Sequence, residues 1–278
     1  MQRKLFLVVL ALLIALPLVA QDLTADQIIA KNIEARGGMA KLKAVKTMKA
    51  TGKMMVGPGI EAPVIVYQRR PDQMRMEITV QGLTLVQAYD GKTGWAIVPF
   101  QGKKDAEQMT ADDVKEVKEQ ADIDGALVDY KLKGHKVELL GKDKVEGSDA
   151  YKLKLTRANG DVETIYVDAD SFLEVKTEGK RTIRGTEMET DSNIGDYKEV
   201  DGLIVPFSID SGAKGRPERQ KITVEKYEFN VPVDAAMFVM PPPAPKAATP
   251  PADKDKKEPA PAATTPAEKP KTADKPKN

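Results

Sequence analysis

Short segments in which apolar and polar residues alternate follow one another through most of the chain. In residues 48–56, methionine, alanine and valine alternate with lysine and threonine, and residues 74–80 repeat this arrangement. A period of two predicts strands that bury one face and leave the other in water. The pattern therefore predicts a mainly β protein with about ten strands. Further strands are expected at 137–140, 151–155, 165–167, 173–175, 181–186, 203–209 and 222–229.

Turn-forming residue pairs indicate how these strands are joined. Four such pairs lie between alternating segments: Gln81-Gly82, Asp90-Gly91, Asn159-Gly160 and Asp201-Gly202. A polar residue followed by glycine favours the tight turns of β-hairpins, because both positions tolerate a left-handed backbone. The sheet is therefore expected to be mostly antiparallel.

The first helix is expected just before the alternating region. Thr24 is a good N-cap residue, and Gln27 three positions later completes a capping box. Isoleucines with helical spacing supply the apolar side, and Gly37-Gly38 ends the segment. These signals predict a helix over residues 24–36 and a short helical turn over residues 39–44.

A second helical segment interrupts the strands at residues 110–120. Its residues are mostly charged, and Val114 and Val117 are its only apolar anchors. A helix with so narrow an apolar stripe buries little surface. We therefore expect a weakly held surface helix.

The two ends of the chain differ in composition from the region between them. Residues 1–20 carry two basic residues near the start, Arg3 and Lys4, continue as an apolar run and end at Ala20, which is typical of a secretory signal peptide. No cysteine follows Ala20, so the usual lipid anchor of bacterial lipoproteins is not expected, and the mature protein is predicted to be soluble and periplasmic. In residues 241–278, eleven of 38 residues are proline, and such a segment cannot bury enough apolar surface to fold.

These boundaries predict a folded domain over residues 21–240 and a disordered tail rich in Pro, Lys and Ala over residues 241–278. The tail either keeps the protein in solution or serves as a spacer or contact arm.

Composition excludes several classes of chemistry. With 43 basic and 42 acidic residues the formal net charge is +1, so no strong overall field favours nucleic acid. The chain has no cysteine and a single histidine, His135, which excludes thiol chemistry and sites that need two imidazoles. No G-x-S-x-G motif and no phosphate-binding glycine loop is present. We expect no enzymatic activity, no metal and no cofactor, and a structural role for His135.

The predicted strands need more apolar cover than the predicted helices can supply. A half-open antiparallel β-barrel lidded by α-helices, with an apolar hollow, would resolve this shortage. Methionine suits such a hollow because its flexible thioether adapts to ligands of varied shape, although ordinary core packing accounts for the same residues. The candidate lining residues are Met48, Met54, Met74, Met76, Ile78, Leu85, Trp95, Ile97, Leu153 and Leu155.

Three stretches carry a family resemblance: residues 69–76 (RRPDQMRM), residues 89–100 (YDGKTGWAIVPF) and residues 233–243 (VDAAMFVMPPP). In order and spacing they resemble the basic-Arg-Pro segment, the tryptophan hairpin and the closing segment of the outer-membrane lipoprotein-sorting carriers, the LolA-like family. The resemblance covers most of residues 22–243. It implies an incomplete antiparallel β-barrel with helical lids that holds the acyl chains of lipoproteins or lipids.

The resemblance also implies roles for single residues. The arginine before the proline, here Arg70, is held in such carriers to latch the lid across the cavity mouth, whereas the alternative is a surface arginine at a strand end. The family has bulky aromatic residues where this chain has Met74 and Met76, which points to a softer lining and a different ligand. Trp95 matches the hairpin tryptophan, either as a wall or rim residue or as a core residue.

The function implied is that of a monomeric, non-enzymatic carrier that passes acyl chains from a membrane-associated donor protein to an acceptor at the outer membrane. Additional strands in residues 171–215 and the tail depart from a minimal carrier. Two other classes stay open. One is an envelope sensor or scaffold that uses the same fold to bind a protein partner, and the other, with least support, is a hydrolase built on paired carboxylates.

Overall fold

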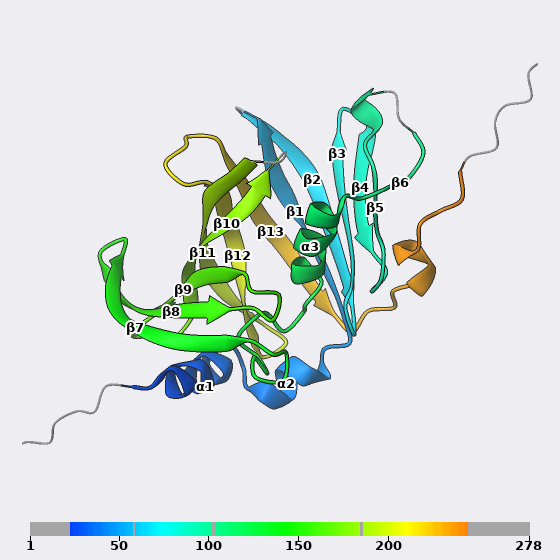
Figure 1. Ribbon diagram of the computed structural model, residues 1–278. Coiled ribbons are helices and arrows are strands. Elements are labelled where there is room, and N and C mark those ends of the chain that lie inside the picture. The colour runs from blue at the N-terminus through cyan, green and yellow to red at the C-terminus, as the bar shows by residue number, and fades with distance from the viewer. Residues whose placement is uncertain (1–22, 58, 102–103, 184–185, 244–278) are drawn as a thin grey trace, which may run out of the picture. The chain divides into compact units, whose positions relative to one another are not determined.

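The computed structural model describes residues 23–57, 59–101, 104–183 and 186–243. Its body is one antiparallel sheet of 13 strands (Figure 1). The strands are β1 (Thr47–Gly57), β2 (Ile60–Arg69), β3 (Gln73–Val80), β4 (Leu83–Tyr89), β5 (Gly94–Ile97), β6 (Glu107–Gln108), β7 (Lys136–Val145), β8 (Ser148–Thr156), β9 (Val162–Asp168), β10 (Glu174–Ile183), β11 (Thr186–Val200), β12 (Leu203–Ala213) and β13 (Arg219–Phe229).

The sheet consists of two runs of sequential strands joined at one long-range pairing. The spatial order is β6-β5-β4-β3-β2-β1-β13-β12-β11-β10-β9-β8-β7, so β1 pairs with β13 and every other pairing joins neighbours in sequence. Within the described residues the outermost strands β6 and β7 do not pair with each other, and the barrel stays open. The prediction of a half-open antiparallel β-barrel is confirmed.

The strand pattern departs from the sequence prediction in several places: β2 and most of β11 were not among the expected strands, and one region was divided wrongly. The separate strands expected at 173–175 and 181–186 are wrong, because Glu174–Ile183 is one continuous strand and a new strand begins at Thr186. Gly179 lies in the middle of β10 and pairs with Thr190 of β11. The strand therefore continues through the residues that the prediction left between two separate strands. Two of the predicted turns, Gln81-Gly82 and Asp201-Gly202, have a positive φ at both central residues and form hairpins.

In the part of the chain that the structure describes, five helical segments accompany the sheet. The capping box predicted at Thr24 is present: its hydroxyl accepts a bond from the Gln27 amide, and its own amide donates to the Gln27 side chain. The segments are α1 (Ala25–Ala35), α2 (Met39–Ala44), α3 (Ala111–Gln120) and the 3-10 turns η1 (Pro99–Gln101) and η2 (Ala235–Phe238).

Helices α1 and α3 lie against the same face of the sheet, which we call the inner face. Ile28 and Ile29 of α1 are buried against Leu153, Leu155 and neighbouring residues of β8 and β9. Helix α3 packs through its valines on Met74 and Tyr89 of β3 and β4. Figure 1 shows α3 in front of the middle of the sheet and α1 below β7 and β8, which leaves much of the inner face without a helical cover.

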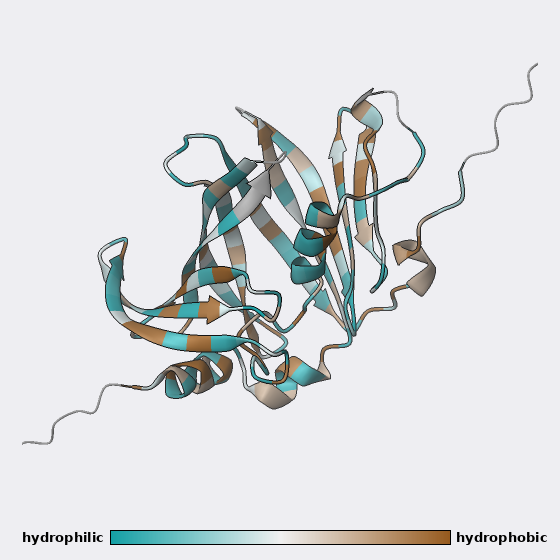
Figure 2. Cartoon of the chain, viewed as in Figure 1, coloured by the Kyte–Doolittle hydropathy of each residue, from teal (hydrophilic) through white to brown (hydrophobic). Residues whose placement is uncertain are grey.

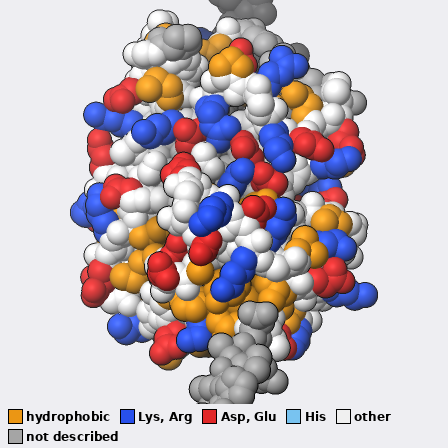
Figure 3. Space-filling view, turned by 90° about the vertical axis from the view of Figure 1, so that its left-hand side faces the viewer, with side chains coloured by type: hydrophobic (Ala, Val, Ile, Leu, Met, Phe, Trp, Pro, Cys, Tyr) orange, Lys and Arg blue, Asp and Glu red, His pale blue; other side chains and the backbone are white. Residues whose placement is uncertain are grey.

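Alternating hydropathy distinguishes the two faces, as Figure 2 shows along the strands. On β7 and β8 the outer face carries ion pairs such as Lys154 with Glu138 and Lys152 with Asp143, each 3.2 Å apart. Figure 3 shows acidic and basic side chains interspersed on this side of the molecule, with hydrophobic ones gathered toward the lower end, near α1. His135 precedes β7 and is half-buried, and its Nδ1 accepts a hydrogen bond from the Ala158 amide.

The chain after β13 covers the outer face of β3 to β5. Phe238 is completely buried, and its carbonyl accepts a 2.7 Å hydrogen bond from the indole Nε1 of Trp95. Arg75 donates to the Met237 carbonyl at 2.9 Å and lies over the Trp95 ring. We call residues 231–240 the strap.

The predicted signal peptide (1–20) and most of the predicted tail (241–278) lie outside the described residues, so those assignments stay predictions. In the part of the chain that is described, no helix is both long and apolar enough to cross a membrane.

Candidate functional site

The inner face of β1 to β4 carries a cluster of apolar residues, which we call the apolar wall. Strand register brings its members together: Val64 lies opposite Ile78, and Ile78 lies opposite Leu85. Four predicted lining residues, Met54, Met76, Ile78 and Leu85, belong to it. The apolar wall consists of Met54, Ala62, Val64, Val66, Met76, Ile78, Val80, Leu85 and Ile222.

Met74 and Met48 extend the same face toward the helices. Met74 is buried beneath α3, and Met48 lies opposite Gln68, which itself lies opposite Met74. The last two predicted residues of the inner face, Leu153 and Leu155, are fully buried beneath α1. They form a separate cluster at the other end of the sheet and are already covered by a helix, so we leave them out of the proposed lining.

Trp95 and Ile97 lie on the opposite face of the sheet from the apolar wall. Their partners in β4 are Ala88 and Val86, whereas Leu85 of the wall faces inward. Trp95 is buried beneath the strap, as described above. The register therefore removes both residues from the set that can line an inner hollow, and gives Trp95 a core role.

Gly94 lets α3 approach the sheet closely. It pairs with Tyr89 on the inner face, and a Cβ at this position would come within 2.9 Å of Met109 Sδ and Val114 Cγ2. At the other end of α3, the Gln68 side chain donates to the Gln120 carbonyl. The helix is therefore seated by a few contacts at its two ends and a short apolar stripe between them.

Arg70 joins three segments that are distant in sequence. Its Nη1 and Nη2 donate to the two carboxylate oxygens of Asp124 at 2.8 and 2.5 Å. Its Nε and Nη2 also donate to the carbonyls of Val45 and Leu42 at the end of α2. Through this one side chain the turn between β2 and β3 is tied to α2 and to the loop that follows α3.

Asp124 is the centre of this network. Its side chain is 3% exposed, and it accepts from Lys43 at 2.6 Å in addition to both bonds from Arg70. Lys43 reaches a second carboxylate, Asp129, at 2.7 Å. We call Arg70, Asp124 and Lys43 the latch network. The sequence analysis identified Arg70 but missed Asp124, because an aspartate in a loop gives no local sign that its partners lie in α2 and at the end of β2.

The stability of the folded protein at acidic pH depends on the protonation of Asp124. Burial raises the pKa of this carboxyl, but hydrogen bonds from Arg70 and Lys43 outweigh burial and lower the pKa from 3.8 to about 2. A carboxyl whose pKa is depressed in the folded state stabilises that state above its unfolded pKa, and the contribution is lost as pH falls.

We therefore expect the free energy of unfolding to fall by about 2 kcal/mol between roughly pH 4 and pH 2 on account of Asp124 alone. Urea unfolding at several pH values would measure this slope. The Asp124→Asn variant should lack that part of the acid dependence, and an unchanged slope in the variant would contradict the assignment.

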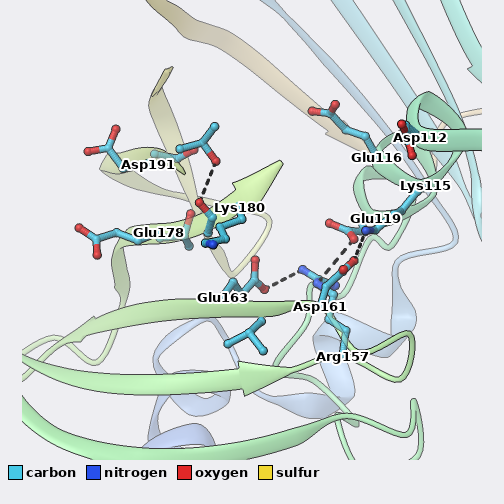
Figure 4. A pocket seen from close by; sticks show the side chains of 15 residues that line it. Asp112, Lys115, Glu116, Glu119, Arg157, Asp161, Glu163, Glu178, Lys180 and Asp191 are labelled. Atoms are coloured by element: carbon cyan, nitrogen blue, oxygen red, sulfur yellow. Dashed lines mark hydrogen bonds and ion pairs between the residues drawn. The ribbon is translucent and has the colours of Figure 1, made fainter. Parts of the chain in front are cut away.

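A second feature of the inner face is a polar cleft between α3 and strands β9 to β11 (Figure 4). From α3 it is lined by acidic residues and Lys115, and from the strands by hydroxyl-bearing and charged residues. Arg157 crosses part of it, pairing with Glu163 at 2.7 Å and approaching Glu119 at 3.8 Å. Among the described residues no group of three or more His, Asp or Glu side chains is placed to hold a metal ion.

The chain folds as an open antiparallel barrel with helices on its inner face, and solved structures with a similar fold include a LolA superfamily protein. No family model and no curated protein matches the sequence. A DUF1329 family protein from Desulfovibrio piger matches with a TM-score of 0.55 at 12% identity, covering 77% of this chain and 96% of the other.

Two further solved structures share the fold. A LolA superfamily protein from Nitrosomonas europaea matches with a TM-score of 0.52 at 15% identity, covering 78% of this chain and 98% of that one. A domain from Vibrio parahaemolyticus that is named a putative outer membrane lipoprotein-sorting protein matches with a TM-score of 0.51 at 11% identity. The match covers 76% of this chain and 94% of that one. At these identities the likeness concerns the fold.

Proposed function

We propose that the protein is a periplasmic carrier without enzymatic activity, which shelters the acyl chains of a lipoprotein or lipid and passes them toward the outer membrane. The observation that carries the proposal is the apolar wall, an extended apolar surface on the inner face beside a lightly seated helix. The resemblance in sequence and the shared fold support the same reading.

An apolar wall inside an open barrel suits acyl chains for a simple energetic reason. Each methylene group left in water costs about 0.8 kcal/mol, so a long chain cannot cross an aqueous compartment unshielded. Val66, Met76, Leu85 and Ile222 of the wall are only half-buried and offer surface to such a chain. The methionines add flexible, polarizable contacts that adapt to different chain shapes.

The latch network gives the carrier a way to release its cargo. Helix α3 covers Met74 and Tyr89, and the loop after it carries Asp124. A chain that enters between α3 and the wall displaces this loop and strains the bonds to Arg70. Re-formation of the bonds between Arg70 and Asp124 therefore favours the empty protein over the loaded one, and so favours release of the cargo, whatever its identity.

Purification of the mature protein under mild conditions, followed by native mass spectrometry, tests the proposal. A bound acylated species, or uptake of added lipid by the free protein, is the expected result. A protein that carries no lipid and takes up none would contradict the carrier function and favour a sensor or scaffold.

Replacing Arg70 with leucine should leave cargo binding intact and slow its transfer. The variant loses four hydrogen bonds that favour closure, so the loaded state becomes relatively more stable, and we expect transfer to an acceptor membrane to fall about tenfold. Arg69→Leu is the matched control, because Arg69 is the neighbouring arginine in sequence and lies outside the latch network. Transfer at the unaltered rate by Arg70→Leu would remove the latch role.

A further inference from the structure

The inner face changes from apolar to hydroxyl-bearing between two adjacent rows of residues. Paired residues of antiparallel strands share a face, as do residues two apart along one strand. The first row runs across β1, β13, β12 and β11 through Met54, Ile222, Ile209 and Ile194. The next row of the same face runs across β13, β12, β11 and β10 through Gln220, Ser211, Ser192 and Thr177. A molecule lying on the apolar wall therefore meets hydroxyl groups directly beside it.

The polar cleft opens onto the part of this second row that Thr177 and Ser192 form, and Ser211 lies next to Ser192. One wall of the cleft is formed by strands β9 to β11, and the other by the charged side of α3, which carries Glu116 and Glu119. Figure 4 shows these residues around the cleft. Val114 and Val117 of the same helix point to the opposite side, onto β3 and β4. Helix α3 thus separates an apolar compartment from a polar one.

Most charges around the cleft are already neutralised by partners in the protein. Lys115 pairs with Asp161 at 2.5 Å, and Lys180 pairs with Glu187 at 2.8 Å, in addition to the Arg157 pair with Glu163. Acidic lining residues outnumber basic ones by seven to three. Two of the acidic residues also pair with cations outside the lining, Glu178 with Lys176 and Asp191 with Arg219. A phosphate or other anionic group would therefore meet no free cation in the described part of the cleft.

The hydroxyl groups, by contrast, have capacity left for a ligand. Ser192 and Ser211 lie 2.7 Å apart, oxygen to oxygen, and this one bond uses the proton of only one of them. The Thr177 hydroxyl has no hydrogen-bond partner among the described residues. These three half-buried groups can together donate and accept toward a neutral polar group.

We infer that the cargo is an amphiphile with an uncharged head group rich in hydroxyl and ester groups, which binds at Thr177, Ser192 and Ser211 while its acyl chain lies on the apolar wall. The inference rests on the proposed carrier function and adds the chemistry of the head. Anionic phospholipids are poor cargo for this site.

Binding of four probes with the same chain length tests the head-group site. Titration calorimetry would compare hexadecane, monopalmitoylglycerol, monopalmitoylglycerol phosphate and palmitylamine with the whole protein. We expect the glycerol ester to bind about tenfold more tightly than its phosphate, because the phosphate cannot be matched by a free cation. Tighter binding of the amine than of the glycerol ester would overturn the inference in favour of a cationic head.

Variants separate this site from the carrier function itself. Thr177→Val combined with Ser192→Ala should reduce the preference for the glycerol ester over the phosphate to within about threefold and leave hexadecane binding unchanged. Ser208→Ala is the matched control, since Ser208 lies on β12 but on the outer face. A preference that survives the double variant would contradict the head-group site alone, whereas failure of every probe to bind would contradict the carrier function.

Discussion

Replacing Asp124 with alanine is expected to lower the free energy of unfolding by about 3 kcal/mol. The substitution leaves the guanidinium of Arg70 and the ammonium of Lys43 without the carboxylate on which both converge. Because the Asp124 side chain is only 3% exposed, water cannot fully solvate the two cations once the carboxylate is removed. Urea unfolding of the purified protein at neutral pH would measure the change.

Asp129→Ala provides the matched control for this prediction. Asp129 binds the same lysine at 2.7 Å, but its side chain is 30% exposed, so its loss should cost less than about 1 kcal/mol. Equal effects of the two substitutions would mean that Asp124 is no more important than a surface ion pair. The Arg70→Leu and Asp124→Ala changes should also be non-additive, because they remove the same two hydrogen bonds.

Replacing Phe238 with alanine should destabilise the domain by about 4 kcal/mol. The Phe238 side chain is completely buried, so its removal leaves a cavity, and the carbonyl of the same residue accepts the hydrogen bond from Trp95. Thermal unfolding followed by tryptophan fluorescence would report both the loss of stability and the altered surroundings of the single tryptophan.

The neighbouring residue supplies the control. Val239 is 53% exposed, and Val239→Ala should change the free energy of unfolding by less than about 0.5 kcal/mol. A small effect of Phe238→Ala would show that the strap is not needed to hold the outer face. Acyl-chain binding by the folded fraction of Phe238→Ala should be retained, because the strap and the apolar wall lie on opposite faces.

Local signals in the sequence predicted the local structure well. The capping box at Thr24 predicted the start of α1 and is present. The charged segment expected at residues 110–120 forms α3, and the structure shows that Thr110 is its N-cap. Side chains within a few residues of each other create these signals, so no tertiary information is needed. What the pattern of α3 could not show was its location, because Met74 and Tyr89, on which it packs, are distant in sequence.

The face on which Trp95 lies illustrates how register decides a candidate site. Alternation identifies two faces of β5 but not which one is inner. The loop between β4 and β5 leaves Tyr89 opposite Gly94, so Gly94 shares the inner face and the next residue, Trp95, must point outward. The length of the loop in YDGKTGW was enough to predict the face of Trp95. The prediction failed because it assumed that every large apolar residue faces one hollow.

The pairing of β1 with β13 has a consequence for how the chain matures. Strands β1 to β6 and β7 to β13 are each built from sequential hairpins, which form soon after their residues become available. One edge of β1, however, has no partner until residues 219–229 have been synthesised. During that interval its backbone donors and acceptors are open to any other extended chain. The last ladder to form is therefore the one that closes this edge of β1 to a second copy of the molecule.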